Sequence, residues 1–584
     1  MKNPLALLLL ASAVSLPACS TLNLTRGSSP AERTGKLSAQ QLGLTADDVA
    51  LSHFLKGEVA MRNADYDVAT REFEAAVELD PEEPRLRARL ANLYVRQGDL
   101  SRGYEQASAA VAGDPEDIQS RLLLAGTLAG LGRENEAAAQ YGEIIELDPG
   151  TPEAYLFLAA LSSKSGNDTV ATETLERLIE SNPNSVMGYY YLGRLHAGAG
   201  RLDEAEQSFN EALKRNPRSA LVMTDLALVE EMKQQPEKAA ALYRKALAAD
   251  PDNVVARNRL ASLLVGQKRL DEALAEFREL ERIEADPTET RVKIGLIYLE
   301  KGDLDRASTE LSLVLSTDPD NARVRYYLGV VFTETGELAR ARENLSAVAA
   351  GSPFYADAQL QLAYLAQTEG NLSAASEHAS AALQARPGST SIIEFLVSLE
   401  RDRKQLKSAI GYAQRLVEID PGNDRYRFML GALYNDAGDR PAALAEMRRA
   451  IEINPQNAAA LNYLGYSLAE EGRDLDEAEQ LIRRALAIDP NDGFYIDSLG
   501  WVYYQRGQYA QAVEELERAV ELTGDDPTIT EHLADAYSQV GRELEALRLY
   551  RSALRRTEDS AQRARLEDKV RAMERADKSG APRL

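Results

Sequence analysis

Prolines recur along this chain at a spacing of 34 residues, and this spacing limits the fold more than any other feature. They stand at Pro81, Pro115, Pro149, Pro183, Pro217 and Pro251, and, after a shift at Pro287, at Pro319, Pro353, Pro387, Pro421, Pro455 and Pro490. A fixed period of this length indicates structural repeats that each pack on their neighbours. Because proline bars the continuation of a helix, each one is expected between helices.

One unit, from Val186 to Ser219, shows the pattern within a repeat. Its first half carries a stripe at helical spacing, Tyr189, Leu192, Gly193 and His196, and its second half carries another, Leu202, Ala205, Phe209, Ala212 and Leu213. The residues between them, 198–200, include two glycines. The unit is therefore predicted to be a helical hairpin, in which the small Gly193 and Ala205 allow the two backbones to approach closely.

Fifteen such units follow one another. They begin near Ala50, Pro84, Ile118, Pro152, Val186, Ala220, Val254, Thr288, Ala322, Ala356, Thr390, Asp424, Ala458, Gly493 and Pro527. The eighth position is small in all but the eleventh repeat, where Val397 stands, and the twentieth is alanine in all but the second, where Gly103 stands. Since Val397 and Lys404 replace small residues in the eleventh hairpin, its packing is expected to be looser.

The period, the small positions and the proline at the end of each unit resemble the tetratricopeptide repeat family over residues 50–556. The resemblance implies an all-α fold, a solenoid of about fifteen stacked hairpins that wind into a right-handed superhelix. It also implies that the first helix of each hairpin lines a concave groove, which binds other proteins or extended peptides. It implies no reaction, and the chain is predicted not to be an enzyme.

Composition excludes several kinds of function. The chain has 67 basic and 92 acidic residues, a net charge of −25, which argues against nucleic acid as a partner. The four histidines, His53, His196, His378 and His532, lie in different repeats, and the chain has one cysteine. No metal site, cofactor, catalytic residue or small-molecule substrate is therefore predicted, and acidic pairs such as Glu230 and Glu231 are interpreted as solvated helix faces.

The amino-terminal residues differ from the repeats. Residues 1–19 combine Lys2, an apolar run too short to span a membrane, and the sequence Leu16, Pro17, Ala18, Cys19. This end resembles the lipobox of bacterial lipoproteins, and the resemblance implies acyl chains on Cys19 and an anchor in the outer membrane, on its periplasmic side. The alternative is an ordinary secretory signal with an incidental cysteine.

The remaining boundaries follow from composition and pattern. Residues 20–44 are polar and are predicted to form a flexible tether. Residues 45–556 form the repeat array, opened by a capping box of Thr45 and Asp48. Residues 557–578 are predicted to form a polar capping helix with one apolar line, Ala564, Leu566, Val570 and Met573, and residues 579–584 a tail.

A binding surface is predicted from helical position. If positions 4, 7, 8 and 11 of each first helix face the core, positions 2, 5, 9 and 12 face the groove. In repeats twelve to fourteen these positions hold residue types common at binding hot spots, together with asparagines suited to a peptide backbone. The candidates are Arg425, Phe428, Asn435, Asn462, Tyr466, Asp497, Trp501 and Tyr504. The alternative is that Trp501 and Tyr504 pack against a neighbouring helix.

Two functions remain open from the sequence. The chain is similar to bacterial lipoproteins that act as adaptors for periplasmic carboxyl-terminal processing proteases, with Asp497 to Trp501 among the similar stretches. That similarity implies a scaffold that holds a protease and its substrates together. The alternative is a scaffold for pilus assembly, secretion, or polysaccharide synthesis and export.

Overall fold

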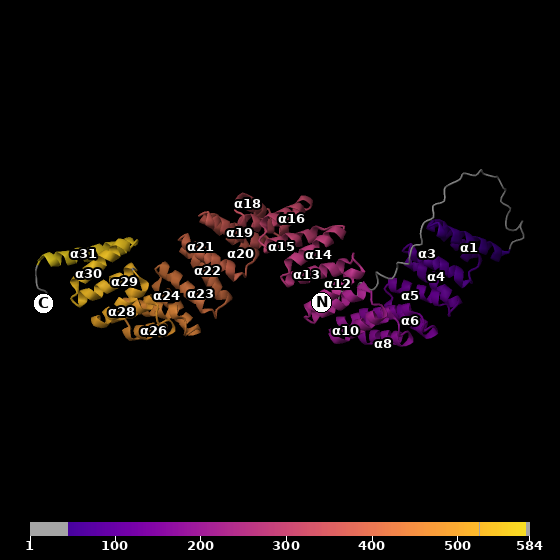
Figure 1. Cartoon of the computed structure of the whole chain (residues 1–584), viewed down its shortest axis with the longest axis horizontal. Helices are drawn as coiled ribbons and strands as arrows, with labels where there is room; N and C mark the ends of the chain where they lie inside the picture. The colour runs from indigo at the N-terminus through magenta and orange to yellow at the C-terminus, as the bar shows by residue number, and fades with distance from the viewer. Residues whose placement is uncertain (1–44, 525, 580–584) are drawn as a thin grey trace. The chain divides into compact units, whose positions relative to one another are not determined.

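The structure is a computed structural model that describes residues 45–524 and 526–579. These residues form helices without strands, joined by short turns (Figure 1). The first eight repeats contain α1 (Ala46–Arg62), α2 (Tyr66–Leu79), α3 (Pro84–Arg96), α4 (Leu100–Gly113), α5 (Ile118–Gly130), α6 (Glu134–Leu147), α7 (Pro152–Lys164), α8 (Asp168–Ser181), α9 (Val186–Gly198), α10 (Leu202–Arg215), α11 (Ala220–Met232), α12 (Pro236–Ala249), α13 (Val254–Gly266), α14 (Leu270–Ile283), α15 (Thr288–Glu300) and α16 (Leu304–Thr317).

The other seven repeats follow the same order and end with one additional helix. They contain α17 (Ala322–Glu334), α18 (Leu338–Ser346), α19 (Tyr355–Thr368), α20 (Leu372–Ala385), α21 (Thr390–Asp402), α22 (Leu406–Ile419), α23 (Asp424–Asp436), α24 (Arg440–Ile453), α25 (Ala458–Glu470), α26 (Leu475–Ile488), α27 (Gly493–Gln505), α28 (Tyr509–Thr523), α29 (Pro527–Gln539), α30 (Glu543–Arg556) and α31 (Ser560–Ser579). The predicted all-α stack of hairpins is confirmed. The chain divides into two compact units, residues 1–297 and 298–584.

Most repeats begin where the sequence pattern predicts. The first helix starts at the first residue of the predicted unit in every repeat except the first and the tenth. Helix α1 starts at Ala46, as the predicted capping box implies: the Asp48 amide donates to Thr45 Oγ1 at 3.2 Å, and the Thr45 amide donates to Asp48 Oδ2 at 2.9 Å. Helix α19 starts at Tyr355 instead of Ala356, after the shortened α18.

The small residue at position 8 of each hairpin faces the residue at position 24 of its second helix. A Cβ built on Gly193 would lie 2.8 Å from the Phe209 ring, and one on Gly500 would lie 2.6 Å from Leu516 Cγ. Ala205 is fully buried beside them. The close approach predicted from Gly193 and Ala205 is thus a contact between a small residue on one helix and a large one on the other.

In the eleventh hairpin the larger residue of this contact lies on the first helix and the smaller residue on the second. Val397 occupies position 8 and is only 4 % exposed, while position 24 is Ala413, which is fully buried. The larger residue on α21 is therefore matched by a smaller one on α22, and looser packing in this hairpin stays a prediction.

First helices inside each unit are buried on more sides than predicted, because they contact their own second helix and the second helix of the preceding repeat, as α9 contacts α10 and α8. Position 3 is buried as a result: a Cβ on Gly188 would lie 3.2 Å from Ile179 of α8. Position 10 is also buried, as at Leu93, Leu161, Val229, Val331 and Leu399.

Position 4 belongs to the core in part of the repeats, as predicted, with Tyr155, Met223, Ile393, Leu461 and Ile496 buried there, and it is polar in most of the others. Arg121 and Arg325, for example, use this position to donate to the carbonyl oxygens of Pro115 and Pro319, at 3.0 and 2.8 Å. The repeating proline loop is therefore bound by the helix that follows it. His196, predicted to face the core at position 11, is only half-buried and accepts a hydrogen bond from Arg201.

The turn inside each hairpin has a left-handed residue at position 15, and the longer turn of the thirteenth repeat has a second one, Asp474 with φ 48°. The residue at position 15 is glycine in eleven repeats, as at Gly200 with φ 75°, and Ala64, Gln234, Lys268 or Lys404 in the other four. A side chain at this conformation is strained, so glycine is the preferred residue.

Helix α31 closes the carboxyl-terminal end of the second unit, next to α30 (Figure 1). Leu566 and Val570 are buried and Met573 is partly buried, as the apolar line predicted. Ala564 is exposed instead, and the buried residue of that turn is Gln562, whose amide bonds Glu531 at 3.1 Å. A polar contact between Gln562 and Glu531 therefore replaces part of the expected apolar contact.

The predicted signal sequence, Cys19 and the tether lie outside the described residues.

Candidate interaction surface in repeats twelve to fifteen

The eight predicted binding residues lie on three first helices, α23, α25 and α27, and differ in exposure. Arg425 and Asn435 are exposed, Asp497 is buried, and the others are half-buried: Phe428, Asn462, Tyr466, Trp501 and Tyr504. The half-buried aromatic residues Phe428, Trp501 and Tyr504 pack at the edge of one hydrophobic cluster. The structure therefore packs three of the aromatic candidates against one core and leaves only two of the eight candidates fully open to solvent.

An aromatic cluster of Tyr466, Trp501, Tyr504 and His532 forms the centre of this region. The Trp501 ring stacks on Tyr504, with centroids 4.7 Å apart and planes 6° apart, and on His532 at 4.1 Å and 21°. Tyr466 of α25 lies 6.3 Å from His532 of α29, so the cluster links three successive repeats. Such ring pairs contribute about 0.5–1.5 kcal/mol beyond their buried area. The alternative, that Trp501 packs against a neighbouring helix, is thus correct for the face of the ring that stacks on His532 of α29.

Asp497 forms a buried ion pair with His532. Its two carboxylate oxygens lie 2.9 and 3.1 Å from His532 Nδ1, and the two residues are 6 and 7 % exposed. Burial disfavours the charged ring, but the charge and hydrogen bond of Asp497, with the charges of Asp535 and Glu531, outweigh it and raise the pKa of His532. Asp497 is therefore held by the protein and is not open to a ligand.

Two buried polar atoms of the eight binding candidates have no hydrogen-bond partner among the described residues. They are Asn462 Oδ1 on α25 and Trp501 Nε1 on α27. Buried polar atoms are nearly always satisfied in folded proteins, so each one needs a further partner. One is an acceptor and the other a donor, the pair of groups that a peptide amide complements.

Helix α31 covers the equivalent positions of the fifteenth repeat. Glu531 and Asp535 occupy positions 5 and 9 of α29, and Lys569 of α31 donates to both, at 2.9 and 2.6 Å. Asp535 also accepts a hydrogen bond from Tyr550. The surface that a partner could reach therefore ends at the fourteenth repeat.

Three residues of the region were missed by sequence reasoning. Phe494, at position 2 of α27, is 57 % exposed and would have been found by applying the groove rule to every position. His532 and Glu531 take part in contacts between repeats. The signal for His532 was a 35-residue offset from Asp497, the same offset that separates Tyr190 from Asp225 and Asn258 from Lys293, which are hydrogen-bonded at 2.9 and 2.8 Å.

The reading of Glu230 and Glu231 as solvated residues is wrong. Glu230 is 2 % exposed, and burial raises its pKa. Glu231 accepts a hydrogen bond from the buried Tyr243 hydroxyl. Glu230 is buried because it occupies position 11 of α11, which faces the core.

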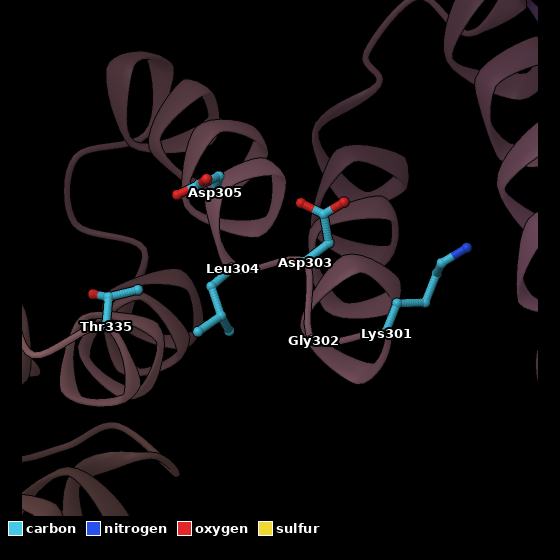
Figure 2. Close-up of a pocket in the computed structure, with 6 residues that line it drawn as sticks. All are labelled: Lys301, Gly302, Asp303, Leu304, Asp305 and Thr335. Carbon is cyan, nitrogen blue, oxygen red and sulfur yellow. The ribbon is translucent and has the colours of Figure 1, made fainter.

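A hollow of 640 Å³ lies at the turn between α15 and α16 and is open to solvent (Figure 2). Its lining is Lys301, Gly302, Asp303, Leu304, Asp305 and Thr335, whose labelled side chains point in different directions. The Asp303 carboxylate caps α16 through the Arg306 amide at 3.2 Å and pairs with the Arg306 side chain. The polar groups do not converge, so the hollow is interpreted as a hairpin turn. No group of side chains suited to a metal ion occurs within the described residues.

Three models of the tetratricopeptide repeat match successive parts of the chain. One matches residues 60–126 and 232–293, a second 163–220, 292–356, 360–424 and 428–493, and a third 500–541. The chain belongs to the tetratricopeptide repeat family. Members of this family typically mediate protein–protein interactions. No match was found among curated proteins.

Solved structures of the family align with the chain at low identity. A tetratricopeptide repeat protein from Parabacteroides merdae is 19 % identical, with 43 % of this chain and 98 % of that one covered and a TM-score of 0.34. The APC/C hetero-tetramer Cut9-Hcn1 is 15 % identical, with 83 and 96 % covered and a TM-score of 0.32. YrrB, described as a repeat protein with an unusual peptide-binding site, is 22 % identical, with 32 and 95 % covered and a TM-score of 0.27.

Proposed function

We propose that this protein is a non-enzymatic adaptor of the bacterial envelope, anchored by a lipid on Cys19, that holds partner proteins on the surface of its repeats. The observation that carries the proposal is the surface in repeats twelve to fourteen, where a half-buried aromatic cluster lies beside the unsatisfied atoms Asn462 Oδ1 and Trp501 Nε1. Aromatic residues with adjacent polar groups are typical of binding hot spots.

A periplasmic processing protease and its substrates are the proposed partners. The support is the resemblance of the repeat architecture and of the stretch from Asp497 to Trp501 to protease adaptor lipoproteins, together with a lipobox-like sequence that ends at Cys19. Within this stretch Asp497 positions His532 against the Trp501 ring, so its role is to hold the aromatic cluster and not to contact the partner.

The proposal is tested by capture of partners from envelope extracts, with their identification by mass spectrometry and a binding assay on the purified partner. Trp501→Ala should weaken binding by about 2 kcal/mol or more, the size typical of a hot spot. Trp501→Phe retains the stacked ring and removes Nε1, so a loss of binding in this variant would identify the N–H as the recognised group.

Circular dichroism melting separates binding from folding in these variants. Because Trp501 also packs on His532 and Tyr504, a modest loss of stability is expected in Trp501→Ala. Normal binding by a folded Trp501→Ala would contradict the assignment of this surface, and capture of neither a protease nor its substrates would contradict the adaptor role.

A further inference from the structure

The first helix of the array has an apolar face that is open to solvent. Leu51, Leu55 and Val59 of α1 are 55, 55 and 59 % exposed. Residues four apart lie on one face of a helix, so the three form a continuous line, which we call the α1 stripe.

Equivalent positions are covered in later repeats. Leu55 and Val59 correspond, four repeats on, to Tyr191 and Leu195 of α9, which pack in one cluster with Leu175 and Ile179 of the preceding α8. The α1 stripe is therefore a repeat-to-repeat contact surface, and no described residue covers it.

The charges around the stripe are arranged symmetrically about Leu55. Asp48 stands seven residues before it and Arg62 seven after, and the stripe residues Leu51 and Val59 stand four before and four after. In an antiparallel pair of identical helices centred on Leu55, Leu51 faces Val59 of the other copy and Asp48 faces Arg62. Asp48 and Arg62 are both exposed, and the pKa of Asp48 is lowered by hydrogen bonds from Thr45, which favours its charged form.

We propose that the α1 stripe is an interface between two copies of this protein, related by a twofold axis through Leu55. The interface places Leu55 against its own counterpart and continues, between molecules, the contact that the array uses between repeats. No like charges meet, because Ser52 faces Glu58 and Asp48 faces Arg62. Three apolar side chains per copy make a small interface, so the association is transient and depends on concentration.

The test is crosslinking of the full chain through a single thiol. In a Cys19→Ser background the chain has no other cysteine. Leu55→Cys places two thiols at the twofold axis, and under a mild oxidant the disulfide-linked dimer should form about tenfold or more faster than for the control, since the interface holds the two thiols together. The control is Leu544→Cys on α30, which is 70 % exposed and far from the stripe in sequence.

Two further variants make the result specific. Arg62→Glu turns the predicted ion pair into repulsion with Asp48, and Leu51→Lys removes an apolar contact, so each should slow crosslinking toward the control rate. All four positions are exposed, and circular dichroism confirms that the variants are folded. Sedimentation of the Cys19→Ser chain with Leu55 intact should show mass increasing with concentration.

Three results would overturn the proposal. They are equal crosslinking rates at Leu55→Cys and Leu544→Cys, rates unaffected by Arg62→Glu and Leu51→Lys, or a constant monomer mass up to high concentration. Crosslinking in envelope extracts only to a different protein would also overturn it and would assign the stripe to that partner.

Discussion

A lysine occupies a left-handed turn position in the eleventh hairpin, where eleven other repeats have glycine. Lys404 has φ 59°. A non-glycine residue in this conformation costs on the order of 1 kcal/mol. Lys404→Gly should therefore raise the free energy of unfolding of the second unit by about 1 kcal/mol, measured by denaturant titration.

Lys404→Ala is the matched control, because it removes the charge and retains the Cβ. It should leave stability close to that of the natural chain. An equal gain from Lys404→Ala would show that charge, and not the backbone, causes the effect.

The buried His532 makes stability depend on pH. Its pKa is raised in the folded state, so the ion pair with Asp497 contributes stability that is fully present below the ordinary histidine pKa of about 6.5 and is lost as the pH rises through the higher folded value. His532→Gln should therefore destabilise the chain most at low pH, and the difference in melting temperature should narrow above pH 6.5.

His378→Gln supplies the comparison for this pH profile. Burial lowers the pKa of His378, which bonds the side chain of Gln359 at 2.7 Å, so its contribution should change in the opposite direction with pH. Parallel profiles for the two variants would contradict the role given to Asp497.

At the scale of the hairpin, the contact between positions 8 and 24 can be tested by giving one repeat the residue pair found in another repeat. Gly193→Val should cost about 1–3 kcal/mol, because the added methyl groups meet the Phe209 ring. Combining it with Phe209→Ala recreates the pair found at Val397 and Ala413. The double variant should therefore be more stable than the sum of the single changes predicts, by about 1 kcal/mol or more.

Hydrogen exchange should locate the effect of Gly193→Val. Because each repeat packs only on its neighbours, protection should fall in α9 and α10 and in the adjacent helices. Additive single and double variants, or uniform loss along the unit, would contradict the direct contact.

At the scale of the whole molecule, the proposed lipid on Cys19 can be tested by its effect on attachment to a membrane. Within the described part of the chain, no helix has the length and apolar character needed to cross a bilayer. As expected for the proposed lipid anchor, Cys19→Ser should move the protein from the membrane fraction to the soluble periplasmic fraction, measured by fractionation and immunoblotting. Retention in the membrane would contradict the lipid anchor, and unchanged fractionation of a Lys56→Gln control would show that the effect is specific.

The sequence by itself determined the family, the hairpins and almost every helix start. These features are local: Pro217 ends one repeat, Gly200 closes its turn, and Gly193 allows its two helices to approach within the same 34 residues. The position of the candidate site was predicted from the same periodicity, since Trp501, Tyr504 and Tyr466 do gather in one cluster.

Only the tertiary structure decided which of these residues are accessible. Asp497 faces His532, and Glu531 faces Lys569, across distances of 35 and 38 residues in sequence. A pattern read within one repeat carries no information on what the neighbouring repeat places against it. Contacts with neighbouring helices cause the burial at positions 3 and 10, the burial of Glu230 and the covering of α29 by α31. These effects appear only in the folded array, because a repeat buries its surface only when its neighbours are in place.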